Sequence, residues 1–307
     1  MSSVAQASGV VNSSDDSVPT ISISHLNSEF FHKNFVIPGR PVLIDKVFDE
    51  EWTLPWLEDK LGEYPVGARY YGAERFHLPK TQWKRYCETR TLPFPEFVKL
   101  LRDGTAARER IYVANCDVSS TPVVTAIQSQ LSNLETRTGL KPNGVSNYSM
   151  WLGAPGHTEP LHFDLADGLL MNLRGTKHIT LVPPSEAHNV YPFGFFDGGL
   201  SPGFSKVYLN QPDLKMYPRM ASALKARQEV ILGPSQALFL PIGWWHEVTT
   251  TGTDYVCSLN RFWKVEPFRR NFVNRYVANI YLVTQMAKPL AAFSGKEQKK
   301  PVVHKAS

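Results

Sequence analysis

Residues 161–184 read LHFDLADGLLMNLRGTKHITLVPP, and this stretch decides the fold that the sequence predicts. Its short apolar segments LHFD, GLLMNLRG and KHITLVPP alternate with turns that contain glycine or proline, which is the pattern expected of β-strands. The same pattern extends over residues 145–263 in the segments SNYSMWLG, SKVYLN, QEVILGP, QALFLP, HEVTTTG and DYVCSLNRFW. Strands this short and this regularly spaced predict an all-β barrel or sandwich.

The segments before and after this β region predict helical decoration and a few more strands. PTISIS (19–24) and RIYVANCDV (110–118) have strand character, and FVIPGRPVLIDKV (35–47) predicts strand, turn, strand. Helical spacing or composition appears in LPWLEDKLGEY (54–64), FPEFVKLLRDG (94–104), PVVTAIQSQLSNLETRTG (122–139) and PFRRNFVNRYVANIYLVTQMAKPL (267–290).

These patterns predict one catalytic-size domain. Residues 19–290 are expected to form it, with a barrel core over 145–263 and C-terminal helices over 266–290. Residues 1–18 are expected to be a disordered leader rich in serine, and residues 291–307 a basic disordered tail.

Composition excludes several classes of protein. The 307 residues are 42% apolar and 20% charged, which excludes collagen, coiled coil and full-length disorder. An apolar run of about 18 residues is missing, so we expect no membrane span. No signal peptide is evident, and the three cysteines are far apart, so we expect an intracellular protein, cytoplasmic or nuclear. The net charge of +5 is too small to favour nucleic acid as a partner.

Three residues in the β region have the chemistry of a metal site. His162 and Asp164 form an HxD pair, and alternate residues of a strand share a face. His246, in PIGWWHEV, lies on a later strand. Two histidines and one carboxylate are the ligands of a facial triad, which holds Fe(II) and leaves positions open for a co-substrate and O₂. Because no thiolate takes part, a structural zinc site is less favoured.

Lys177 gives a second indication of function. It begins the strand KHITLVPP, in which Lys177, Ile179 and Leu181 share one face. A lysine inside a barrel is unfavourable unless an anion pairs with it, and a dicarboxylic co-substrate that chelates the metal would supply one. A lysine that extends to solvent from the end of a strand would give the same pattern.

An HxD pair also occurs by chance, and His157, His178 and His188 lie nearby without forming a ligand motif. The metal hypothesis therefore depends on three features together. These are the HxD pair, the basic residue on the second strand of the following hairpin, and the distal histidine after a PxGWWH turn.

The sequence resembles the cupin-like JmjC hydroxylases, which are Fe(II)- and 2-oxoglutarate-dependent oxygenases with a double-stranded β-helix (jelly-roll) core. The segments that carry the resemblance are MWLGAPGHTEPLHFD, LRGTKHITLVPP, LPIGWWHEV and SLNRFW, together with the N-terminal VIPGRPVLI and WTLPWLEDKLG. The resemblance covers roughly residues 20–290 and implies a mainly β fold with N-terminal and C-terminal helices.

The resemblance implies roles for individual residues. It assigns His162, Asp164 and His246 to iron, and Lys177 with Tyr112 to the distal carboxylate of 2-oxoglutarate. Asn260 corresponds to a polar position near the iron-binding end of the co-substrate. Trp151 corresponds to a common tryptophan for which core packing is an equally good interpretation.

The sequence departs from the family pattern at two positions. Relatives usually have Thr or Ser three residues before the first histidine, where this chain has Glu159. Either Thr158 contacts the co-substrate instead, or Glu159 points elsewhere, to a cationic substrate for example. Relatives often have Asn where this chain has Gly168, and Asn172 on the same face is expected to compensate, in a roomier pocket.

The resemblance implies hydroxylation of an unactivated C–H bond, with 2-oxoglutarate converted to succinate and CO₂. The substrate is a protein or peptide side chain, or else a small molecule; tRNA and a methylated histone are less favoured. A non-catalytic binding protein, or a metal cupin that does not use 2-oxoglutarate, remains a rival. Residues 191–206 are a candidate substrate lid, or else a plain surface connection. Phe163 and Trp245 are candidates for the lining of the cavity, or else for the core. Residues 266–290 are a candidate homodimer interface.

Overall fold

The computed structural model describes residues 17–49, 52–74, 78, 80, 87–140, 147–194, 197 and 200–293. The predicted leader and tail fall outside these residues, except at 17–18 and 291–293. Parts of the candidate lid, residues 195–196 and 198–199, also lie outside them.

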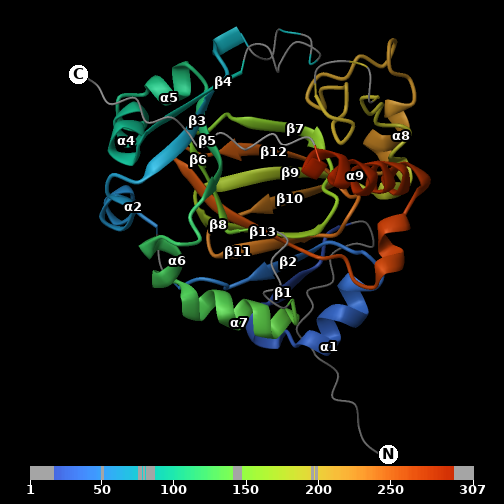
Figure 1. Ribbon diagram of the computed structural model, residues 1–307, viewed down its shortest axis with the longest axis horizontal. Coiled ribbons are helices and arrows are strands. Elements are labelled where there is room, and N and C mark those ends of the chain that lie inside the picture. Colours follow the sequence, from blue (N-terminus) through green and yellow to red (C-terminus); the bar gives the residue numbers. More distant parts are fainter. Residues whose placement is uncertain are drawn as a thin grey trace, which may run out of the picture.

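The strands form two sheets, as the sequence predicts for a jelly-roll, and Figure 1 shows them gathered at the centre of the molecule. The larger sheet contains, in spatial order, β1 (Thr20–Ser22), β2 (Val42–Asp45), β11 (Gln236–Leu240), β8 (Asp167–Arg174), β13 (Val256–Trp263), β6 (Ser149–Gly153), β5 (Ile111–Asp117), β3 (Pro65–Tyr70) and β4 (Glu88–Pro93). The smaller sheet contains β10 (Gln228–Leu232), β9 (Thr176–Val182), β12 (Trp245–Thr251) and β7 (Thr158–His162). Only the β1–β2 pair is parallel among these strands.

Helices surround the strands. Figure 1 shows α2, α4 and α5 on one side and α8 and α9 on the opposite side. Asn27 and Thr53 cap α1 and α2 by accepting hydrogen bonds from Phe30 N and Trp56 N. The helices are α1 (Ser28–Phe31), α2 (Leu54–Leu61), α4 (Phe94–Arg102), α5 (Thr105–Arg108), α6 (Pro122–Ala126), α7 (Gln128–Thr138), α8 (Met220–Lys225) and α9 (Arg275–Phe293), with short helices η1 (Ile23–His25), η2 (His32–Val36), η5 (Pro184–Glu186) and η6 (Phe268–Phe272). Within the described part of the chain, no helix is long and apolar enough to cross a bilayer.

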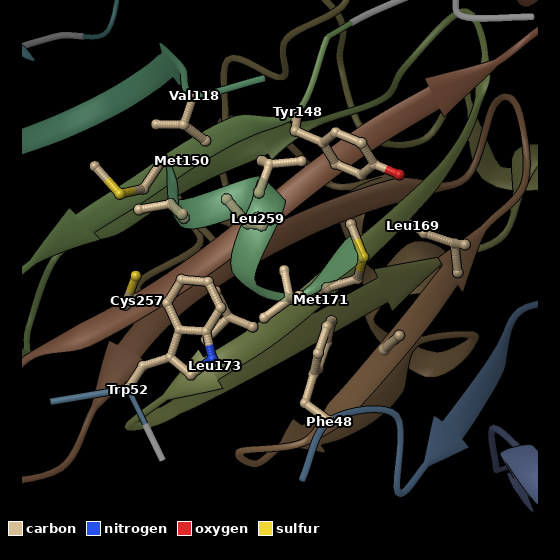
Figure 2. Packing of buried hydrophobic residues seen from close by; sticks show 14 of the residues in the cluster. Phe48, Trp52, Val118, Tyr148, Met150, Leu169, Met171, Leu173, Cys257 and Leu259 are labelled. Atoms are coloured by element: carbon tan, nitrogen blue, oxygen red, sulfur yellow. The ribbon is translucent and has the colours of Figure 1, made fainter. Parts of the chain in front are cut away.

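The main core lies on the outer face of the larger sheet. Leu169 and Met171 of β8 and Leu259 of β13 point to this face, where Phe48 and Trp52 from the N-terminal segments cover them (Figure 2). Because side chains alternate along a strand, covering this face leaves the opposite face of the same strands for a cavity.

The sequence-based prediction was wrong in three segments. Phe35 and Val36 end η2 instead of forming a strand, because both are buried and Phe35 packs on Phe31 one turn earlier. Residues 205–210 form no strand, since backbone groups there bond to side chains, as Val207 N does to Ser205 Oγ. The helix expected over 122–139 is interrupted at Ile127.

Candidate metal centre

His162, Asp164 and His246 come together at one end of the smaller sheet. Their ligand atoms lie within 4.8 Å of one another. His162 ends β7 and pairs directly with His246 near the start of β12, which brings their ring centroids to 4.2 Å. Asp164 Oδ2 lies 3.6 Å from His246 Nε2. Three donors at this spacing can all contact one ion.

Both histidines are oriented for metal binding by their backbone contacts. His162 Nδ1 lies 2.7 Å from Pro160 O, and His246 Nδ1 lies 3.0 Å from Trp244 O. A carbonyl oxygen can only accept, so Nδ1 carries the hydrogen and Nε2 keeps the lone pair that a metal needs. Burial lowers the pKa of His246 to about 4, which keeps this imidazole neutral.

Loops, and not the expected strand, place Asp164. β7 ends at His162, and Phe163 N donates to Gly203 O while Asp164 O accepts from Gly243 N at 3.2 Å. Gly243 has φ +80° and lies in the turn that leads to His246. The two ligand-bearing segments are therefore tied together directly.

A cavity of about 520 Å³ extends from these residues between the two sheets. At the metal end, Leu240, Gly168 and Phe262 form one register row on the larger sheet. Leu240 directly precedes the turn that leads to His246, and Gly168 follows the loop that carries Asp164. This row therefore faces the metal ligands. Lys177 lines the cavity from its other end, just after the turn at Gly175 where the chain passes from β8 of the larger sheet to β9 of the smaller sheet, so the expected hairpin does not form.

The deep end of the cavity is polar. Lys177 is 3% exposed, and its Nζ donates to the hydroxyl of Tyr112 at 3.3 Å. Burial lowers the pKa of Lys177 to about 8 and raises that of Tyr112 well above its usual value. The ring of His157 stacks on Tyr112 with centroids 3.9 Å apart, and Arg69 adds a second cation. These groups provide a site for an anion.

The donor set fits a divalent first-row metal together with a dicarboxylate. Two neutral imidazoles and one carboxylate suit iron, and Lys177 suits the distal carboxylate. Trp151 Nε1 and Asn260 Oδ1 line the same cavity, are buried, and have no hydrogen-bond partner among the described residues. Buried polar atoms of this kind are normally satisfied; a carboxylate of the co-substrate can accept from Trp151 Nε1, whereas Asn260 Oδ1 requires a donor such as a water molecule or the substrate.

Comparison with known proteins agrees with this geometry. The sequence model of the protein family described as "Cupin-like domain" matches residues 27–268, which is well over half of the chain. The chain belongs to the cupin-like JmjC family. Its relatives include lysine-specific demethylase 8 of Xenopus tropicalis, 25% identical over 81% of this chain and 53% of that protein.

Two further relatives of this JmjC protein carry other names. The tRNA wybutosine-synthesizing protein 5 of Danio rerio is 24% identical over 79% of this chain and 74% of its own length. HSPB1-associated protein 1 of Homo sapiens is 36% identical over 33% of this chain and 20% of its own. The chain spans about half the length of the frog relative. Members of the JmjC family are typically Fe(II)- and 2-oxoglutarate-dependent oxygenases.

The departure at position 159 has a structural explanation. His246 pairs with His162 but Val248 pairs with Glu159, so β7 has one extra residue between the two pairs. This β-bulge breaks the alternation of side chains. Glu159 and His157 therefore line the metal cavity, whereas Thr158 faces the other side of the sheet, where its hydroxyl lies 3.0 Å from Thr249 Oγ1. The expectation that Thr158 replaces the usual residue was wrong, because Thr158 does not line the metal cavity; Glu159 does line it, and its contact with a cationic substrate stays a prediction.

Glu159 lies among the polar groups of the deep end. Its Oε2 is 3.5 Å from His157 Nε2, and its charge raises the pKa values of Arg69 and Lys177 against the effect of burial. One carboxylate thus lies in the field of two cations, which leaves a net positive charge for an incoming anion.

Gly168 and Asn172 also differ from expectation. A Cβ at Gly168 would lie 2.9 Å from Phe262 Cε1, so the phenylalanine ring fills the space and the pocket is not roomier there. Asn172 does not line the cavity, because its amide donates to Gly175 O at 2.7 Å and to Leu232 O at 3.3 Å. It ties β8 to the neighbouring turns instead.

The structure also shows which of the remaining candidate residues line the cavity and which lie in the core. Tyr112, Trp151, Asn260 and Phe163 line the cavity, while Trp245 is core and packs on Phe163 with ring centroids 4.9 Å apart. The lining residues that sequence reasoning missed include Arg69, Asn115, and Ile280 and Thr284 of α9. No metal or co-substrate motif pointed to them, and only the helical period of α9 indicated an apolar face.

Proposed function

We propose that this chain is an Fe(II)- and 2-oxoglutarate-dependent hydroxylase that inserts oxygen into an unactivated C–H bond and releases succinate and CO₂. The observation that carries the proposal is one cavity with a His–Asp–His cluster at one end and a buried lysine at the other. A protein or peptide side chain, or a small molecule, is the substrate in this proposal.

The residues of this chain provide binding, orientation and exclusion of water. His162, Asp164 and His246 would hold iron, and the bound metal with 2-oxoglutarate and O₂ supplies the oxidising power. Lys177 and Tyr112 would bind the distal carboxylate, which fixes the co-substrate in one direction. Phe163 and Phe204 line the cavity and keep the reacting end dry.

An anaerobic titration with Fe(II) and 2-oxoglutarate tests the assignment. We expect the weak visible charge-transfer band of the chelate in wild type, its loss in His246→Ala, and a weakened band in Lys177→Ala at the same 2-oxoglutarate concentration. His178→Ala is the matched control, because this histidine lies on the outer face of β9, paired with Glu229 at 3.0 Å.

The outcomes separate the proposal from its rivals. No band in folded wild type would refute the proposal and favour a binding protein. Iron binding that is lost in His246→Ala, but is unchanged by 2-oxoglutarate and by Lys177→Ala, would favour a metal cupin of another class.

A further inference from the structure

The cavity has few charged side chains. Among the described lining residues, those other than the metal ligand Asp164 are Arg69, Glu159 and Lys177. Lys177 lies at the deep end, and the charge of Glu159 acts on Arg69 and Lys177 as well as on His246. The one carboxylate besides the metal ligand thus has two cations of the protein in its field.

The metal end is apolar on the side away from the ligands. Leu240 and Phe262 flank Gly168 on the larger sheet, Leu165 follows Asp164 in the chain, and Ile280 reaches the cavity from α9. Gly168 lets the Phe262 ring lie directly against the backbone of β8. The family pattern often has an asparagine at this position, so this chain replaces a polar amide by an aromatic wall.

Two of the aromatic rings at this end already pack on other rings. Phe204 is stacked on His162, with centroids 5.0 Å apart and planes at 17°. Phe163 packs on Trp245 and Tyr276. These contacts reduce the ring surface left for a cation–π contact, and a charged group without a counter-ion is disfavoured beside an apolar wall.

We infer that the group oxidised by this site is an uncharged, apolar part of the substrate, aliphatic or aromatic, and not a methylated ammonium group. The wall of Leu240, Phe262, Leu165 and Ile280 would hold it beside the metal. This inference rests on the proposed function, since it takes the His–Asp–His cluster as the reacting end.

Two isosteric probes test the inference without knowledge of the substrate. Choline carries a trimethylammonium group, and 3,3-dimethylbutan-1-ol carries the same shape as an uncharged tert-butyl group. The protein is loaded with 2-oxoglutarate and with Mn(II), a paramagnetic ion that carboxylate and imidazole donors accept. Proton NMR then measures the line broadening of each probe's methyl signal, which reports proximity to the metal.

We expect the neutral probe to be broadened about tenfold more than choline at equal concentration, a difference of about 1.4 kcal/mol in binding. Phe262→Glu should reduce broadening of the neutral probe and increase that of choline. Ile231→Glu is the matched control, because Ile231 on β10 is 60% exposed outside the cavity, and it should change neither signal.

Each other outcome counts against the inference. Equal broadening, stronger broadening of choline, or no broadening by either probe while Mn(II) is bound would overturn it and leave the metal assignment intact. Failure of Mn(II) to bind, followed by its electron paramagnetic resonance signal, would instead refute the proposed function and this inference with it. The comparison of the two probes in wild type tests the inference even if the Phe262→Glu variant does not fold.

Discussion

Lys177 shows how a functional residue can reduce stability. It is buried beside Tyr112, and its charged form lacks the solvation that water gives an exposed lysine. Glu159 from β7 offsets part of this effect, as does Cys257 from β13 when ionised, yet burial still lowers the pKa of Lys177 to about 8. The ordinary value is 10.5, so the protein without co-substrate holds this charge at a disadvantage.

We predict that Lys177→Met stabilises the protein while weakening 2-oxoglutarate binding. Because the pKa is lower in the folded state, the unfolded chain binds more protons between pH 8 and 10.5. The unfavourable contribution is therefore fully present below pH 8 and fades as the pH rises through this window. At pH 7 we expect the free energy of unfolding to increase by on the order of 1–2 kcal/mol, after the lost hydrogen bond to Tyr112 is subtracted.

Urea unfolding without co-substrate at pH 7 measures the effect. Lys225→Met is the matched control, because Lys225 is exposed on α8, and it should change stability by less than about 0.5 kcal/mol. A less stable Lys177→Met protein would show that the lysine contributes favourably even without an anion.

At the residue scale, the sequence pattern predicts which side chains share a cavity better than it predicts backbone geometry. The HxD pair, His246 and Lys177 were recognisable as a set because few other roles bring these residue types together at that spacing, and they do line one cavity. Thr158 was misplaced because the bulge in β7 reverses the inward face, and a sequence pattern does not show an extra residue in a strand.

At the scale of elements, one buried ion pair joins the C-terminal region to the metal end of the barrel. Arg270 of η6 donates to Asp167 of β8 through Nη2 at 2.8 Å, and both side chains are buried. Asp167 Oδ1 also accepts from Ile242 N at 3.0 Å, in the turn that leads to His246. This one carboxylate therefore ties η6, β8 and that turn together.

We predict that Arg270→Ala lowers the free energy of unfolding by about 3–5 kcal/mol at pH 7, because it leaves a buried carboxylate without its cation. Burial already raises the pKa of Asp167 despite the arginine. Loss of Arg270 should raise this pKa further, so protonation at lower pH should reduce the deficit. Urea unfolding of the variant at pH 7 and pH 5 measures both effects.

Arg90→Ala is the control, since the Arg90–Glu88 pair is exposed and its loss should leave the free energy of unfolding nearly unchanged. An equal effect of both substitutions would contradict the argument from burial. So would a deficit in Arg270→Ala that is independent of pH.

Most elements could be predicted from the sequence, because apolar runs closed by turn residues indicate short strands directly. The exceptions arise where side-chain contacts override strand propensity. Phe35 and Val36 favour a strand by propensity, but the Phe35 ring packs on Phe31 four residues earlier, and Phe31 packs on Phe239 of β11 with ring centroids 5.0 Å apart. The hydroxyl of Ser205 accepts from Val207 N, a donor that could otherwise pair with a strand. The contact with β11 joins distant segments and is not visible in a local pattern.

At the scale of the whole molecule, exposed apolar surface is concentrated at the C-terminal end. Of the nine large apolar side chains that are exposed in the described part of the chain, five lie in η6, in α9 or between them: Phe268, Phe272, Val273, Leu282 and Val283. The other face of α9 buries Val277 and sends Ile280 into the cavity. A helix with two apolar faces requires a second partner.

We predict that this surface pairs with a second copy of the chain. Light scattering coupled to size exclusion at micromolar concentration should give twice the chain mass of 34.6 kDa. Leu282→Glu combined with Val283→Glu should return it to the mass of one chain, because two buried charges oppose the contact. Ile231→Glu is the control at a site that is 60% exposed on β10, the edge strand of the smaller sheet.

A monomeric wild type would exclude the dimer. A dimer would connect assembly with activity, since Ile280 and Thr284 line the cavity from the same helix that the partner copy would cover. Tyr276 strengthens the connection, because its hydroxyl donates to Pro202 O at 2.6 Å and so joins α9 to the segment that bears Gly203 and Phe204 at the metal end. Dissociation should then weaken binding of the neutral probe beside the metal. Binding of 2-oxoglutarate should be unchanged, because its distal carboxylate is held by Lys177 and Tyr112 at the opposite end of the cavity.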